Sequence, residues 1–450
     1  MTQTPAALTN ILGGALGRHA KPGGMWFNPA PWAYLALTLS WLLLALRQLP
    51  CRKSSDMFPN MCYSDITVLY YWRGLQDGKI PYLDSEVEYP VLTGAFMELG
   101  RRLVVLLGGR SEPGLSSTDT THAAGLFFGI NIVLLFALFA LVVWTHLQFH
   151  RPWDALMIAV APAIWTSALI NWDGLVIALT ALAMLAWARR SPVWTGVWLG
   201  LGIAAKLYPV LLLVPLAVLC LRSGRWRPFF VTLGTTVAAW VAVNLPVYLA
   251  TPSGWMNFWT FNVDRGGDLG SIWYVLSLAG YAVGSVSKLV AAIMVAGTLV
   301  ICGLLLLAPR RPRFAQGVFL IVALFLMVNK VYSPQYVLWL LPLLVLARPR
   351  WLDWAVFSVA EGFYFVAIWA HLDGRSAAGD GHDRIYWLSV LLRIAVQLWL
   401  CVRVALDMVR PERDVVRAGG LDDPDGGIFD RSPDAPWLVR LNERLLQTGP

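Results

Sequence analysis

The sequence has little charge. Only 14% of its 450 residues are Asp, Glu, Lys or Arg, whereas 57% are apolar. A soluble globular domain is about 25% charged and about 45–50% apolar. This shortage of charge excludes an ordinary soluble domain and argues against intrinsic disorder. The chain also has only five cysteines, which excludes a scaffold held together mainly by disulfides.

Clustered positive charge is a second feature that the sequence lacks. The net charge is +8, but the basic residues are spread between apolar runs and do not gather in one segment. A nucleic-acid-binding protein concentrates them on one face, so we expect no nucleic acid among the partners. The 23 tryptophans fit a protein with two membrane–water interfaces, where this side chain collects. The lipid bilayer is therefore the first partner that the composition predicts.

Apolar runs long enough to cross a membrane recur along the chain. A spanning helix needs about 20 mostly apolar residues. We expect an all-α, polytopic integral membrane protein with about twelve transmembrane helices. The expected spans are 31–49, 123–145, 153–170, 172–188, 193–206, 208–222, 229–249, 286–308, 314–331, 334–347, 351–371 and 385–405.

The basic residues in the short connections predict the orientation. Arg189 and Arg190, Arg222 to Arg227, Arg310 to Arg313 and Arg348 with Arg350 all fall on one side, which the positive-inside rule assigns to the cytoplasm. Segment 1–30 is then cytoplasmic, without a cleavable signal peptide, and 31–405 is the membrane domain. Segment 406–450 is expected to be a cytoplasmic, partly disordered and solvated tail. Residues 50–122 become one large outer loop.

One apolar stretch of this outer loop has two interpretations. Val91–Gly108 is apolar enough for a span, but Glu98, Arg101 and Arg102 interrupt it. A span there would invert every later basic connection. We therefore favour an amphipathic helix lying on the outer surface.

Polar residues gather at the predicted outer ends of the spans. Ionisable groups near membrane depth are costly and are functional candidates for that reason. The outer candidates are Asp65, Glu88, Tyr89, Asn171, Asp173, Lys206, Tyr208, Arg265, Asp268, Lys330 and Gln335.

Three of these candidates are positively charged residues on the predicted outer side, where the positive-inside rule does not call for positive charge. Lys206 precedes Tyr208-Pro209, Lys330 precedes Ser333-Pro334, and Arg265 lies in a glycine-rich outer loop. A single lysine at a helix end is most often a snorkelling side chain. Two such lysines with an arginine favour a phosphate site, since ammonium and guanidinium groups both suit that anion.

Asp65 and the outer cysteines each have two interpretations. Asp65 follows Cys62-Tyr-Ser in an aromatic stretch, where it could act as a general base or, like Ser64, cap a helix. Cys51 and Cys62 lie on the predicted outer side, where they either form a disulfide or remain free thiols.

The outer loop 372–384 and its flanks contain five further polar residues. They could form a metal site, an acceptor site or simply a solvated loop: His371, Asp373, Asp380, His382 and Asp383. We expect neither a metal ion nor a cofactor.

A series of short motifs resembles glycosyltransferase family 87, actinobacterial membrane enzymes of the GT-C superfamily. The motifs are Tyr-Ser-Asp at 63–65, Gly78-Lys-Ile-Pro-Tyr82, Glu88-Tyr-Pro90, Asn171-Trp-Asp173, Gly196 to Pro209 and Ser333-Pro-Gln-Tyr336. The resemblance runs from about residue 31 to 405. It implies a helical bundle of the GT-C type whose first outer loop carries two membrane-lying helices.

The resemblance also implies a reaction and roles. Such enzymes transfer a sugar from a polyprenyl-phosphate donor to a glycolipid or polysaccharide of the cell envelope, on the outer face of the plasma membrane. Asp65 would be the base of an inverting transfer, and Lys206, Lys330 and Arg265 would hold the donor phosphate. The donor sugar would be mannosyl, as in alpha-1,2-mannosyltransferases, or arabinofuranosyl. A transporter or flippase of a lipid-linked substrate is the alternative function.

Overall fold

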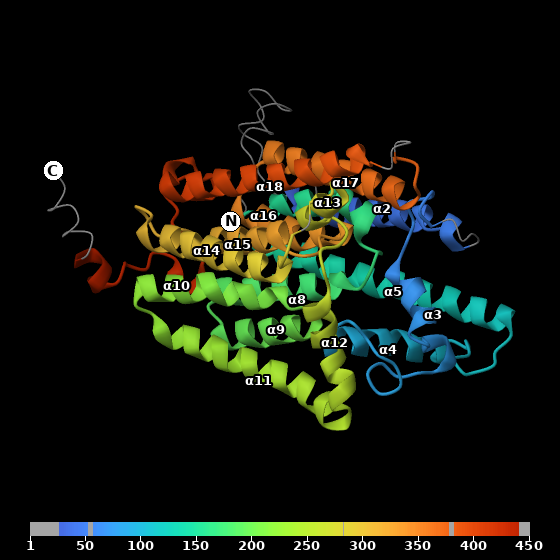
Figure 1. The fold of residues 1–450 in the computed structure, drawn as a ribbon. Helices are drawn as coiled ribbons and strands as arrows, with labels where there is room; N and C mark the ends of the chain where they lie inside the picture. The colour runs from blue at the N-terminus through green and yellow to red at the C-terminus, as the bar shows by residue number, and fades with distance from the viewer. Residues whose placement is uncertain (1–26, 53–56, 282, 378–381, 441–450) are drawn as a thin grey trace.

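The described residues form a bundle of helices. The computed structural model describes residues 27–52, 57–281, 283–377 and 382–440, and within these ranges it contains helices and no β-strand (Figure 1). One isolated backbone bridge joins Pro81 and Ser85. An all-helical architecture suits a membrane because a helix satisfies its own backbone hydrogen bonds.

Among the described residues, six helices are long and apolar enough to cross a membrane. Each corresponds to one of the expected spans. They are α2 (Pro29–Arg47), α5 (Ser117–Leu147), α11 (Trp226–Ala250), α14 (Val286–Leu307), α17 (Trp351–Leu372) and α18 (Arg384–Val409).

The other expected spans are shorter helices. Proline begins or follows several of them, because its missing backbone N–H is harmless at a helix start, although Pro342 lies inside α16. The expected span 153–170 is divided at Pro162 into two short helices. The shorter helices are α6 (Ala155–Ala159), α7 (Pro162–Ser167), α8 (Asp173–Ala188), α9 (Pro192–Ala205), α10 (Leu213–Ser223), α15 (Phe314–Val328) and α16 (Val337–Ala347).

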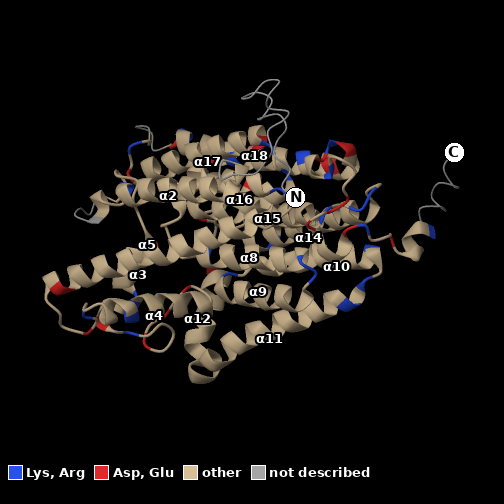
Figure 2. Ribbon diagram, turned by 180° about the vertical axis from the view of Figure 1, so that it is seen from behind, with Lys and Arg blue, Asp and Glu red and all other residues tan. Residues whose placement is uncertain are grey.

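The remaining helices lie at one end of the bundle. They are α3 (Asp65–Trp72), α4 (Val91–Leu106), α12 (Pro252–Asp264) and α13 (Ile272–Leu278). In Figure 1, α12 crosses the ends of α8, α9 and α11, and α3 and α4 lie beside it. We call this the outer end, and the opposite end, with the connections 189–191, 222–227, 308–313 and 348–350, the basic end. Charged residues are concentrated toward the two ends (Figure 2).

The chain beyond α18 packs against the basic end. Phe429 is fully buried and its ring lies 5.0 Å from that of Trp187. Arg313 and Asp414 form a buried ion pair at 2.6 Å, and Arg222 pairs with Asp434 at 2.9 Å. The expectation of a solvated tail is therefore wrong for residues 411–440, because carboxylates of the tail neutralise arginines of the connections. Residues 441–450, like 1–26, lie outside the described residues.

The outer loop is attached to the bundle at several points. A disulfide joins Cys51 and Cys62, whose Cα atoms are 5.9 Å apart. The predicted helix at Val91–Gly108 is present as α4, with 16 residues. It packs on α5 and α9, and the hydroxyl of Thr93 donates a hydrogen bond to the carbonyl oxygen of Ala205 at 2.7 Å.

Tyr82 and Gly94 hold the segment that carries Glu88 and Tyr89. The hydroxyl of Tyr82 donates to the carbonyl oxygens of Tyr89 at 2.9 Å and Pro90 at 2.8 Å. A Cβ atom at Gly94 would overlap the Tyr82 ring, which is buried. The absence of a side chain at position 94 therefore lets Tyr82 reach these carbonyls.

The first prediction concerns this glycine. Gly94→Ala should destabilise the protein by about 1–3 kcal/mol, as overpacking of a filled core does, and should lower activity by displacing Tyr82. Gly129→Ala on α5 is the matched control, because a Cβ there meets nothing within 4 Å and alanine favours a helix. Thermal unfolding of both variants in detergent checks this. Equal melting temperatures would show that the close approach of Tyr82 is unimportant.

Candidate active site

A cavity of about 500 Å³ lies at the outer end, between the first outer loop, α12 and the bundle. Its wall combines many apolar and aromatic side chains with a few polar groups, which is typical of a substrate site. Seven of the sequence-predicted residues line it: Asp65, Glu88, Tyr89, Asn171, Lys206, Arg265 and Gln335. The structure therefore brings together residues from six separate places in the sequence.

Asp65 begins α3 but does not cap it. The side chain of Ser64 accepts the hydrogen bond from the backbone N–H of Ile66 and is the cap. The Ser64 hydroxyl also donates to the carbonyl oxygen of Leu169, and the N–H of Asp65 donates to that of Ile170. These bonds tie the start of α3 to the connection before α8. The Asp65 carboxylate is left to face the cavity.

Two tyrosines hold the Asp65 carboxylate. The hydroxyl of Tyr63 donates to Oδ1 at 2.8 Å and the hydroxyl of Tyr89 to Oδ2 at 3.1 Å. Burial raises the pKa of Asp65 to about 6, although both tyrosines and Lys206 act in the opposite direction. A carboxylate with such a pKa is mostly ionised at neutral pH and is a better proton acceptor than an exposed one. This environment suits a general base.

Lys206 lies beside Asp65 in an aromatic enclosure. It follows α9 in an extended conformation, so that its side chain leaves the helix and reaches the cavity. Its ammonium is 3.1 Å from Oδ1 of Asp173 and 4.7 Å from the ring centre of Tyr89. The rings of Tyr336 and Trp339 are 5.5 and 5.6 Å away. Because Asp173 is the only carboxylate of the described chain that pairs with it, this cation can also attract an anion in the cavity.

Two amide side chains present polar atoms to the same space. The Oδ1 atom of Asn171 accepts from the N–H of Asp173 at 2.9 Å, whereas its Nδ2 is buried without a hydrogen-bond partner. The Oε1 atom of Gln335 is also buried without one. Buried unpaired polar atoms are costly, and a ligand with hydroxyl groups would satisfy both.

Two ion pairs complete the polar part of the wall. Arg73 pairs with Glu88 at 2.7 Å, and Arg265 pairs with Asp268 at 2.6 Å. Arg265 ends α12 and lines the cavity, whereas Asp268 does not. The Arg265 pair is about one third exposed, which leaves the guanidinium accessible to a second anion.

Four predicted residues do not line the cavity. Asp173 lies behind Lys206 as its partner. Tyr208 is buried, exchanges a hydrogen bond with Thr180 at 2.9 Å and stacks on Trp339. The ammonium of Lys330 donates to the carbonyl oxygens of Asn262 and Val263, at the end of α12. Lys330 therefore fixes the end of α12, next to Arg265. Asp268 is the ion-pair partner of the same arginine.

Sequence reasoning missed several residues of the site. Tyr63 and Arg73 hold carboxylates of the cavity, and Tyr336 lines it next to Lys206. Tyr63 and Tyr336 stand within the quoted motifs, so proximity in the sequence could have indicated them. Arg73 directly follows α3, eight residues after Asp65, and no motif marks it. Its pairing with Glu88 arises only from the fold of the loop.

A second group of aromatic side chains, Phe58, Tyr63 and Trp369, forms another part of the wall. The ring of Phe58 stacks on Tyr63 at 5.7 Å and on Trp369 at 6.1 Å. Such faces can bind a sugar ring or an isoprenoid chain. Nearby, His371 pairs with Asp383 at 2.8 Å, while Asp380 lies outside the described residues. Within the described ranges, no group of three or more His, Cys, Asp or Glu could hold a metal ion.

A second prediction follows from the environment of Asp65. The carboxylate accepts a proton only when ionised, so kcat should rise with pH through about 6 and level off above neutrality. A pH–rate profile at saturating donor measures this. A profile that stays flat between pH 5 and 8 would contradict the assignment, since the carboxylate would then titrate outside this range.

The helices are those of a polytopic membrane protein, and a cavity with a few polar side chains lies at one end of the bundle. The model of glycosyltransferase family 87 matches residues 115–329. This match confirms the resemblance found in the motifs and indicates a membrane glycosyltransferase. No curated protein matches the chain. The matched region contains Asn171, Asp173, Lys206, Tyr208, Arg265 and Asp268; it begins after Asp65, Glu88 and Tyr89 and ends before Lys330 and Gln335.

Proposed function

We propose that the protein transfers a sugar from a polyprenyl-phosphate donor to a cell-envelope glycolipid or polysaccharide. The observation that supports this most is the position of Asp65 and Lys206 on the wall of one cavity. A base and a cation at a shared site are what glycosyl transfer from a phosphate requires. The apolar wall suits the isoprenoid part of such a donor, and the unpaired amides suit the hydroxyls of a sugar.

The proposed reaction is a direct displacement. Asp65 takes the proton of the acceptor hydroxyl, whose oxygen forms a bond to the anomeric carbon. The bond between that carbon and the phosphate oxygen breaks, and the bonding pair leaves with the polyprenyl phosphate. Lys206 and Arg265 stabilise the charge that develops on the leaving group. Attack from the face opposite the phosphate gives inversion, and the chain supplies the charges without a cofactor.

The proposal includes the location of the site. It assumes about twelve spans in a GT-C arrangement with the basic connections in the cytoplasm, so that the cavity faces the extracytoplasmic side of the plasma membrane. The lining residues lie at helix ends and in connections, which favours an enzyme over a transporter or flippase, whose binding site lies near the bilayer midplane. Thr118 and Glu412 are exposed at the two ends. Cysteines at these positions should react with an impermeant reagent from opposite sides of the membrane.

A donor panel tests the function. The purified protein is incubated with labelled polyprenyl-phospho-mannose or polyprenyl-phospho-arabinose and with actinobacterial envelope glycolipids. We expect transfer from the mannosyl donor, with the arabinofuranosyl donor as the second choice. Transfer of label to the acceptor is measured by chromatography. Transfer from a nucleotide sugar alone would refute a lipid-phosphate donor.

A further inference from the structure

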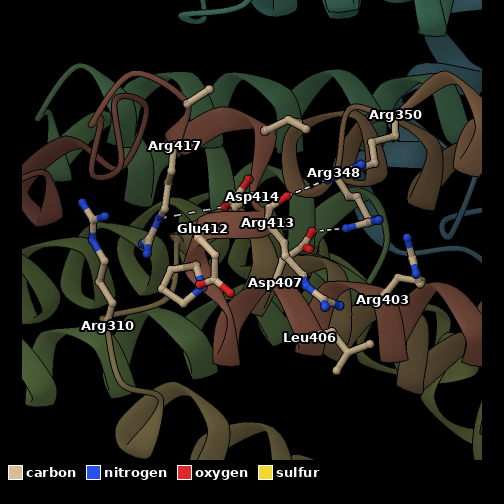
Figure 3. Close-up of a pocket in the computed structure, with 13 residues that line it drawn as sticks. Arg310, Arg348, Arg350, Arg403, Leu406, Asp407, Glu412, Arg413, Asp414 and Arg417 are labelled. Atoms are coloured by element: carbon tan, nitrogen blue, oxygen red, sulfur yellow. Dashed lines mark hydrogen bonds and ion pairs between the residues drawn. The ribbon is translucent and has the colours of Figure 1, made fainter.

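A second cavity, of about 700 Å³, lies at the basic end (Figure 3). It is formed by the connection between α16 and α17, the last turns of α18 and the first part of the tail. Six arginines line it against three carboxylates. The arginines are Arg310, Arg348, Arg350, Arg403, Arg413 and Arg417.

The carboxylates neutralise only some of these arginines. Arg348 is buried and pairs with Asp353 and Asp407. Arg310 pairs with Asp422 at 2.9 Å, outside the lining. Within the described part of the chain, no carboxylate forms an ion pair with Arg350, Arg403 or Arg413. The cavity is therefore positive because three guanidinium groups lack a charged partner.

Several of these guanidinium groups have one nitrogen atom without a hydrogen-bond partner among the described residues, although Arg350 and Arg417 each donate a hydrogen bond to a backbone carbonyl oxygen through Nη2. Within the described ranges, the buried Nε atoms of Arg350, Arg403 and Arg417 have no hydrogen-bond partner, and Arg417 Nε lies 3.9 Å from Oδ2 of Asp414. Burial and the nearby charge of Arg310 lower the pKa of Arg417. Figure 3 shows Arg310 and Arg417 on one flank of the cavity and Arg348, Arg350 and Arg403 on the other. Asp407, Glu412 and Asp414 lie between the two flanks, so an anion has to bind at the guanidinium groups themselves, where the buried Nε–H groups can donate hydrogen bonds to it.

We propose that this cavity binds a phosphate group. One guanidinium group can donate two parallel hydrogen bonds to two oxygens of a phosphate. Arginine is for this reason enriched at phosphate-binding sites in proteins. The cavity lies beside the ends of α16, α17 and α18, and basic pockets between membrane helices on the cytoplasmic side bind anionic headgroups. The phosphate therefore comes from an anionic lipid or from a soluble phosphorylated compound. Bound phosphate would fix the tail against α18.

This site is separate from the proposed active site. The two cavities share no residue and lie at opposite ends of the bundle. Failure of sugar transfer would leave phosphate binding at the basic end untouched, and the reverse also holds. The test can therefore use stability of the full-length protein as its readout, without a donor or an acceptor.

The test compares two double variants in detergent. R403Q/R413Q removes two arginines that pair with no carboxylate in the described chain, so no buried acid is left alone. R410Q/R440Q is the matched control, since both side chains are exposed and neither lines the cavity. Melting temperature is followed by tryptophan fluorescence during titration with inorganic pyrophosphate or with cardiolipin. Chloride at equal ionic strength and phosphatidylcholine are the blanks.

We expect saturable stabilisation of the wild type and of R410Q/R440Q. The R403Q/R413Q variant should bind about tenfold or more weakly, because each lost contact is a charged hydrogen bond. Stabilisation by pyrophosphate indicates a soluble compound, and stabilisation by cardiolipin alone indicates a lipid headgroup; both support the site. The proposal is overturned if neither probe stabilises the wild type, or if the two double variants have equal midpoints.

Discussion

Asp65→Asn is expected to lower kcat by about 10²–10⁴-fold, the usual contribution of a general base. Asparagine keeps the size of the side chain and can still contact Tyr63 and Tyr89, but it cannot accept the acceptor proton. Donor binding should survive, because the cation that holds the phosphate is unchanged. Steady-state kinetics with a labelled donor, together with a binding measurement, separates the two effects.

The same variant should be more stable than the wild type. The raised pKa of Asp65 means that the folded state favours the protonated form. Ionisation therefore costs folding free energy above about pH 6, and stability falls as pH rises from the unfolded pKa near 4 through this value. A neutral asparagine removes that cost. If Asp65 were a structural cap, its loss would instead lower the melting temperature.

Asp77→Asn is the matched control for this experiment. Asp77 lies in the same outer loop, and its side chain accepts a hydrogen bond from Gln76 without lining the cavity. We expect wild-type kcat and no gain in stability. Near wild-type turnover by Asp65→Asn would sink the assignment and turn attention to Glu88, the other carboxylate on the cavity wall.

Lys206→Met should have the second largest effect. It removes the one lysine of the cavity, so the KM for the donor should rise and kcat should fall because the leaving phosphate loses its partner. It also leaves Asp173 buried with an unpaired charge, which costs on the order of 3 kcal/mol. Kinetics at varied donor concentration and thermal unfolding measure these two losses separately.

A double variant distinguishes the role in binding from the role in stability. Lys206→Met with Asp173→Asn removes both charges, so stability should return while donor KM stays high. Lys288→Met, an exposed lysine at the start of α14, is the control for general loss of charge and should behave as the wild type. If the double variant regains donor affinity, Lys206 is only the structural partner of Asp173.

The outer end of the fold was largely predictable from apolar runs and charge. The basic connections predicted which ends of the helices belong together, and this placed Asp65, Lys206 and Gln335 at a common end. The prolines after Lys206 and Lys330 indicated the breaks in the helices. The lengths of the helices were less predictable. The apolar run 153–170, for example, predicts one continuous helix, but Pro162 divides it into two.

Other features depend on contacts between distant parts of the chain. Lys206 and Lys330 have similar sequence contexts, yet only Lys206 reaches the cavity, because the carbonyl groups at the end of α12 bind the Lys330 ammonium. The tail is rich in Asp, Gly and Pro, which suggests solvation. Its aspartates instead meet arginines from the connections, over a hundred residues earlier in the chain.

The position of the donor phosphate is the central claim, and a structure of the protein with a polyprenyl monophosphate tests it most directly. We predict phosphate density at the outer end, within ion-pair distance of Lys206 and next to Arg265, with the isoprenoid chain along the apolar wall of the cavity. Phosphate density beside Lys330 alone, or only among the arginines of the basic end, would contradict this account.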